Sequence, residues 1–117
     1  MLQKEVLKET TEREYMNFIT DCETSIERYK NTASIIVSRN GNPVDDVYDL
    51  SVAHYREMDY ITTQYELRIA NIWEECDALT TEVNYYIDCI VRVYRRSQSR
   101  LYDIMKTATD RYAIYVM

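Results

Sequence analysis

Glycine and proline, the residues that most often end helices and shape turns, are almost missing from this chain of 117 residues. Each occurs once, at Gly41 and Pro43, and residues 44–117 contain neither. A β-rich chain with so little glycine would lack the residues that tight hairpin turns require. The sequence therefore predicts an all-α protein built from long helices.

The strongest break in the helical pattern is the segment Arg39-Asn40-Gly41-Asn42-Pro43. Gly41 suits the left-handed position that follows a helix. Asn42 suits a helix cap, and Pro43 suits the first position of the next helix. These signals predict a helix, a tight loop and a second helix. A local β-hairpin is the alternative, because β-branched residues precede an Asn-Gly pair, but no alternating strand follows.

Apolar residues recur at alternating steps of three and four on both sides of this loop, which is the heptad pattern of helices that pack side by side. Before the loop the pattern comprises Tyr15, Ile19, Cys22, Ile26, Tyr29, Ala33 and Ile36. After the loop it comprises Tyr65, Ile69, Ile72, Cys76, Leu79, Val83, Tyr86, Ile90, Val93, Ser97, Leu101, Ile104, Ala108, Tyr112 and Tyr115. The alternation is regular from Tyr65 to Ser97, and a four-residue insertion follows at Leu101. One straight helix after the loop would extend about 110 Å, which is too long for a compact monomer.

A second break is expected near Thr80, where poor helix formers coincide with a potential helix cap. This break gives a single helical domain, residues 1–117, with helices at about 2–38, 43–79 and 81–116. Three helices of similar length favour an antiparallel three-helix bundle with coiled-coil character. The alternative is a helical hairpin whose long second arm pairs with another subunit.

The chain is acidic, with a net charge of −6, but its charges are unevenly distributed. Residues 1–83 contain 17 acids and 8 bases, whereas residues 84–117 contain 3 acids and 6 bases. The overall acidity argues against general nucleic-acid binding, which requires cations that displace counterions. Charges at Asp88 and Arg92 interrupt the most apolar stretch, so we expect no membrane insertion.

Candidates for catalysis or metal binding are few. His54 is the only histidine, and Cys22, Cys76 and Cys89 lack the spacing of a zinc site or a disulfide framework. The sequence therefore predicts no catalytic residue, no cofactor and no metal site, and we do not expect an enzyme. An active site formed between subunits is the remaining alternative. The odd number of cysteines favours a reducing, cytoplasmic location.

Tyrosine is unusually abundant, with twelve residues. Its ring is apolar and its hydroxyl is polar, so it suits interfaces that are partly wet. Three tyrosines lie off the heptad pattern, and three arginines at steps of four share one helix face. We therefore predict a partner-binding surface formed by Tyr85, Tyr94, Tyr102, Arg92, Arg96 and Arg100. In the alternative interpretation, the tyrosines cover the edge of the bundle with their hydroxyls in water.

Together these features predict a helical protein-protein interaction module, an adaptor or assembly subunit without catalytic activity. We expect it to self-associate as a homodimer, because complementary charged surfaces steer association. The alternative is an acidic decoy that blocks a nucleic-acid-binding enzyme with carboxylates at phosphate spacing. The sequence identifies neither the protein partner nor the biological process.

Overall fold

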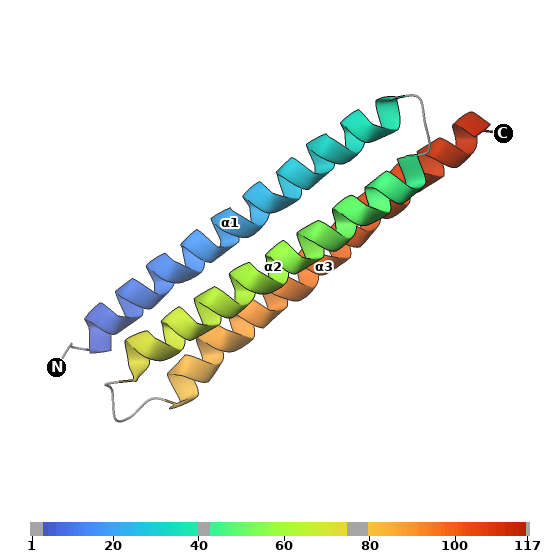
Figure 1. Ribbon diagram of the computed structural model, residues 1–117. Helices are drawn as coiled ribbons and strands as arrows, with labels where there is room; N and C mark the ends of the chain where they lie inside the picture. Colours follow the sequence, from blue (N-terminus) through green and yellow to red (C-terminus); the bar gives the residue numbers. More distant parts are fainter. Residues whose placement is uncertain (1–3, 40–42, 75–79, 117) are drawn as a thin grey trace.

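In the computed structural model the chain folds into three long helices (Figure 1). The structure describes residues 4–39, 43–74 and 80–116, with side chains for residues 5–39, 43–74 and 82–110, and these parts contain no strand. The helices are α1 (Lys4–Ser38), α2 (Pro43–Trp73) and α3 (Thr80–Val116). This arrangement confirms the predicted all-α three-helix bundle, and the hairpin with one long second arm is not formed.

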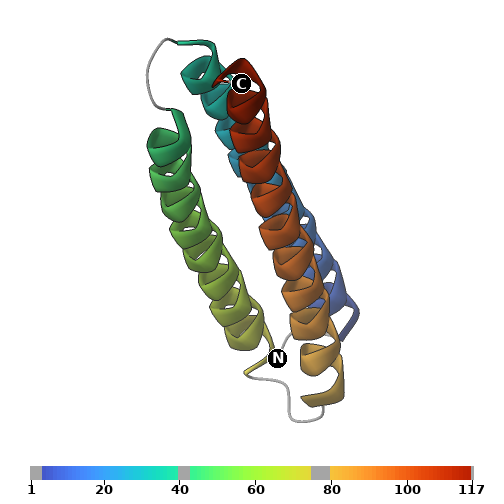
Figure 2. The same cartoon turned by 90° about the vertical axis from the view of Figure 1, so that its right-hand side faces the viewer.

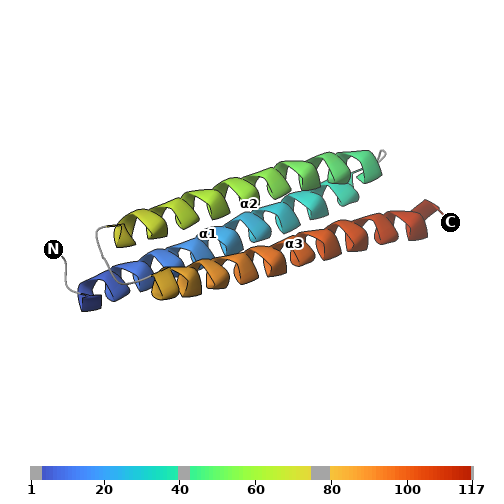
Figure 3. The same cartoon turned by 90° about the horizontal axis from the view of Figure 1, so that it is seen from below.

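The bundle is elongated, with extents of 64 × 18 × 16 Å. All three helices lie side by side along its length (Figures 2 and 3). The helix α2 runs opposite to α1, and α3 returns in the direction of α1, so α1 and α3 are parallel (Figure 3). Because the number of helices is odd, Lys4 and Val116 lie at opposite ends of the bundle.

The helix ends follow the local signals of the sequence. Pro43 is the first residue of α2, where its missing N–H group costs nothing, and acidic residues follow in the first turn. The backbone N–H of Arg39 donates to the carbonyl of Ile36 at 3.2 Å and closes the end of α1. Because α1 is helical through Ser38, the β-branched residues before the loop do not form a hairpin.

The helix α2 ends at Trp73, before the expected end at residue 79. There the N–H of Glu74 donates to the carbonyl of Asn71 at 3.3 Å, which tightens the last turn. Several predicted features lie outside the residues or side chains that the structure describes: the caps at Gly41 and Asn42, and the heptad positions Cys76, Leu79, Tyr112 and Tyr115.

Large apolar side chains from all three helices form one core. On α1 the predicted heptad residues Cys22, Ile26 and Tyr29 are buried, whereas Tyr15 and Ile19 are half-buried at the margin. Burial of each large side chain stabilises the fold by about 1.5–3 kcal/mol. The buried apolar residues are Leu7, Phe18, Cys22, Ile26, Tyr29, Ala33, Val47, Met58, Tyr65, Ile69, Trp73, Ile90, Leu101 and Ala108.

Polar side chains also lie in this core and join the helices. The Trp73 indole N–H on α2 donates to the Thr11 hydroxyl on α1 at 2.8 Å. The Tyr55 hydroxyl on α2 donates to the backbone carbonyl of Gln98 on α3 at 3.3 Å. Because buried polar groups are costly without partners, such bonds favour one alignment of the helices along the bundle axis.

Candidate functional site

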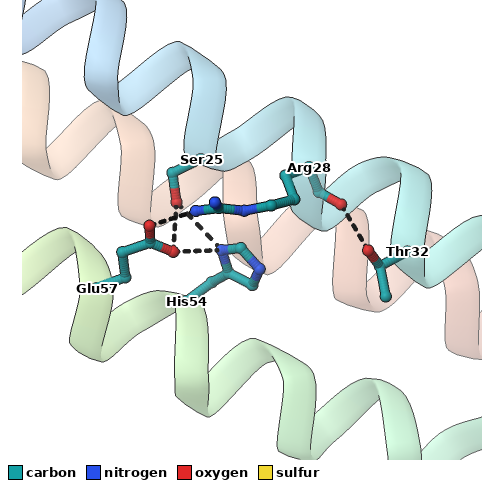
Figure 4. Close-up of polar contacts among 5 residues, drawn as sticks. All are labelled: Ser25, Arg28, Thr32, His54 and Glu57. Atoms are coloured by element: carbon teal, nitrogen blue, oxygen red, sulfur yellow. Dashed lines mark hydrogen bonds and ion pairs between the residues drawn. The ribbon is translucent and has the colours of Figure 1, made fainter.

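A polar cluster that extends from the core to the surface joins α1 to α2 (Figure 4). The Ser25 hydroxyl on α1 lies 3.1 Å from Nδ1 of His54 and donates to Oε2 of Glu57 at 3.1 Å. Nδ1 of His54 is 3.3 Å from the same carboxylate oxygen. The Arg28 guanidinium binds the other oxygen of Glu57. Four polar side chains therefore satisfy one another at the boundary between core and solvent.

The cluster contains serine, histidine and a carboxylate, the residue types of a hydrolytic triad. In such a triad the two histidine nitrogens contact serine and carboxylate separately. Here both Ser25 and Glu57 contact Nδ1 of His54, and Ser25 gives its proton to Glu57. In addition, Ser25 is only 1% exposed, so a substrate would not reach its hydroxyl. The arrangement is that of a core polar cluster, not of a nucleophile and its base.

The surroundings of His54 favour its neutral form. Burial lowers the pKa of His54, the charge of Glu57 opposes this shift, and Arg28 adds to it. The Tyr29 ring packs on the imidazole with 5.1 Å between ring centroids. The Tyr29 hydroxyl in turn forms a hydrogen bond with Ser51. His54 is therefore held by neighbours on both α1 and α2.

A second candidate site is a groove of about 250 Å³ between the parallel helices α1 and α3. Its lining comprises Tyr15, Ile19, Cys22, Glu23 and Ile26 from α1, and Val93, Arg96, Ser97 and Arg100 from α3. Cys22 is almost completely buried, and this burial raises the pKa of its thiol to about 12. The lining of the groove thus combines the buried, uncharged side chains of Cys22, Ile26 and Ser97 with the charged side chains of Glu23, Arg96 and Arg100.

The predicted arginines are exposed on one side of α3, and we call Arg92, Arg96 and Arg100 the arginine ridge. Arg96 and Arg100 line the groove, and Arg92 lies one helical turn before Arg96. Arg100 forms an ion pair with Glu27 of α1 at 3.2 Å. Among the described side chains, no carboxylate lies within ion-pair distance of Arg92 or Arg96. The ridge therefore carries positive charge that the described parts of the chain neutralise only at one end.

Three exposed glutamates follow the α1 side of the groove, and we call Glu12, Glu23 and Glu27 the acidic row. Their positions share one side of α1, because steps of eleven and four return to nearly the same angle. Glu23 lines the groove. Burial raises the pKa of Tyr86 on α3, and the negative charge of Glu12 raises this pKa further. The groove therefore has one acidic and one basic side.

The predicted tyrosines divide between two faces of the bundle. Tyr85 is 60% exposed near the arginine ridge, and its ring meets Tyr86 edge to face at 5.4 Å. Tyr94 is half-buried and donates a hydrogen bond to Asp59 of α2. Tyr102 is 52% exposed and also lies toward α2. Of the six predicted partner-binding residues, Arg96 and Arg100 thus line the groove, Tyr85 and Arg92 precede them on the same side of α3, and Tyr94 and Tyr102 lie on the α2 side.

The polar cluster was not predicted from the sequence. His54 and Glu57 are one helical turn apart, but no local pattern places α1 beside them. A usable signal was Ser25, a polar residue set between Cys22 and Tyr29 on the buried side of α1. A serine at such a position needs a hydrogen-bond partner from elsewhere in the fold.

Other site types have little support from the described residues. No group of three or more histidine, cysteine, aspartate or glutamate side chains gathers there as a metal site would require. Over the same residues, none of the helices combines the length and the apolar character needed to cross a membrane. Comparison of the chain with protein-family models, curated proteins and solved structures finds no match.

Proposed function

We propose that this chain is a helical protein-protein interaction module, an adaptor or assembly subunit without catalytic activity that works in the reducing cytoplasm. The observation that carries the proposal is the α1–α3 face. On this face a groove with apolar, serine and cysteine side chains lies between the arginine ridge and the acidic row. Tyr85 and Met16 add apolar surface, with 60% and 58% of their area exposed.

The residue types on this face are those that stabilise protein interfaces. Tyrosine, methionine and arginine are enriched where proteins bind one another, and arginine is frequent among residues that dominate binding. The guanidinium groups of Arg92 and Arg96 have no ion-pair partner among the described side chains. They remain available to carboxylates of a partner, with two parallel hydrogen bonds to each carboxylate.

We further propose that one partner is a second copy of the chain. A face about as long as the 64 Å bundle offers on the order of 1,000 Å² per copy, and stable complexes bury about 800 Å² per partner. A bundle only 18 Å wide has a thin core, so a dimer would also reduce the solvent exposure of its apolar side chains.

The acidic decoy receives less support. A decoy presents carboxylates on a face that is free of positive charge, because a nucleic-acid-binding groove is itself basic. The acidic row of α1 lies directly beside the arginine ridge, and Glu27 is already paired with Arg100. The ridge would repel a basic groove at that face, so the interaction module is the better-supported proposal.

Affinity capture from the source cell, followed by mass spectrometry, tests the proposal. We expect specific proteins with the wild type and their loss when Arg92, Arg96 and Arg100 are all replaced by glutamate. A matched control replaces exposed cations away from the groove, using R56E, R95E and K106E. Equal capture by the wild type and the ridge variant would contradict the proposed face. Capture of a nucleic-acid enzyme that depends on the acidic row alone would favour the decoy.

A further inference from the structure

We infer that a second copy docks in parallel orientation on a two-fold axis along the α1–α3 groove, so that α3 of each copy contacts α1 of the other. This inference rests on the proposed interaction face and adds the geometry of its partner. Four helices would then alternate around the axis as α1, α3, α1 and α3. The argument for this orientation comes from the level of each charge along the bundle.

The Arg100–Glu27 ion pair fixes how α1 and α3 align. Because the two helices are parallel, one turn back on each places Arg96 level with Glu23, and both line the groove. Three residues onward from the pair, Asp103 on α3 is level with Lys30 on α1. Exposed charges on α1 and α3 thus have opposite signs at three successive levels along the bundle. At the first two levels the acid lies on α1, and at the third level it lies on α3.

Two kinds of two-fold axis can place this face against itself. An axis along the groove exchanges α1 and α3 but keeps each residue at its level, so Arg96 of one copy faces Glu23 of the second copy. An axis perpendicular to the helices places α3 of one copy on α3 of the second copy, so that the two arginine ridges face each other. Because like charges in contact disfavour association, only the axis along the groove gives a complementary interface.

The exposed apolar residues of the face agree with this axis. Tyr85 on α3 and Met16 on α1 are both more than half exposed. The alignment set by Arg100 and Glu27 places them about one helical turn apart in level. An axis along the groove therefore brings Tyr85 of each copy close to Met16 of the other, and contacts between methionine sulfur and aromatic rings are favourable.

Charge-swap variants test the orientation. The ridge variant carries R92E, R96E and R100E. The double-swap variant adds arginine at Glu12, Glu23 and Glu27, which restores the wild-type net charge and keeps opposite charges at the Arg100–Glu27 position. Circular dichroism verifies that each variant is helical, and light scattering on a sizing column measures its mass. Wild type and double-swap chains with different tags are also unfolded and refolded together.

We expect the wild type and the double-swap variant each to form dimers of about twice 14.0 kDa. The ridge variant should dimerise at least about tenfold more weakly, because its α3 then faces acids on α1 of the second copy. After joint refolding, wild-type and double-swap chains should form mainly homodimers, since a mixed dimer has like charges at the level of Arg96 and Glu23 and at the level of Arg100 and Glu27.

Three results would overturn the inference. Predominantly mixed dimers would place the axis across the helices, because that axis makes wild type and double swap complementary. A ridge variant that dimerises as tightly as the wild type would place the contact on another face. A wild type that is monomeric at micromolar concentrations would exclude the dimer. If the wild type is monomeric, the capture experiment still decides whether the face binds a different protein. The parallel dimer and the interaction module can therefore be refuted independently.

Discussion

Two buried threonines provide an experiment in which the same substitution should change stability in opposite directions. The Thr11 hydroxyl donates to the carbonyl of Leu7 at 2.7 Å and accepts the indole N–H of Trp73 at 2.8 Å. The Thr62 hydroxyl oxygen is also buried, but none of the described residues forms a hydrogen bond with it. Valine has the shape of threonine without the hydroxyl, so each Thr→Val change isolates one polar group.

The expected magnitudes follow from the two environments. T11V leaves the buried Trp73 N–H without an acceptor, and we expect the free energy of unfolding to fall by about 1–3 kcal/mol. T62V removes a hydroxyl that is buried without a partner, and we expect the free energy of unfolding to stay unchanged or rise by about 1–2 kcal/mol. Threonine and valine have similar helix propensities, so this contribution largely cancels.

Urea unfolding followed by far-UV circular dichroism measures both changes. With a slope of about 1–3 kcal/mol per molar urea, the midpoints of the two variants should separate by on the order of 1 M. Trp73 fluorescence gives a second readout, which should change in T11V and not in T62V. Equal destabilisation by both variants would show that Thr62 has a partner, such as an ordered water. A neutral T11V would show that the bond to Trp73 does not stabilise the fold.

Three further outcomes are expected. Because burial holds the pKa of His54 below its ordinary 6.5 despite Glu57, the unfolded chain takes up a proton first as the pH falls. The free energy of unfolding of the wild type should therefore decrease as the pH falls below 6.5. An unchanged free energy of unfolding over the same range in the His54→Gln variant would assign the decrease to His54. In a Cys76→Ser background, a thiol reagent should modify half-buried Cys89 in the native state and buried Cys22 only on unfolding; rapid modification of both would contradict the burial. Chelator should leave the melting temperature unchanged, and a lower melting temperature would indicate a structural metal.

The sequence was sufficient to predict the fold class and the first turn. Long helices follow from the near-absence of glycine and proline, and the start of α2 follows from Pro43 and the acids after it. The core of α2 before Tyr65 was harder to predict, because three of its buried positions, Ser51, His54 and Thr62, are polar. Apolar periodicity does not include such positions, although Tyr29 and Ser25 of α1 form hydrogen bonds with Ser51 and His54.

The six residues of the predicted binding surface do not all lie on one face of α3, and their spacing in the sequence explains why. An α-helix turns about 100° per residue, so residues two apart point to nearly opposite sides. Tyr94 is two residues from Arg96, and Tyr102 is two residues from Arg100, so neither tyrosine shares the face of the ridge. By contrast, which residues of α1 lie beside the ridge depends on how the loops align the helices, and no local pattern records that alignment.

The opposite positions of Lys4 and Val116 have a mechanical consequence. A pull between these two residues is directed along the bundle axis, so it slides the helices past one another instead of peeling one helix away. Sliding must break the contacts at many levels together, including Trp73 with Thr11 and Ser25 with His54. Peeling would break them one level at a time. The bundle should therefore resist tension along its axis far better than a sideways force applied to a single helix.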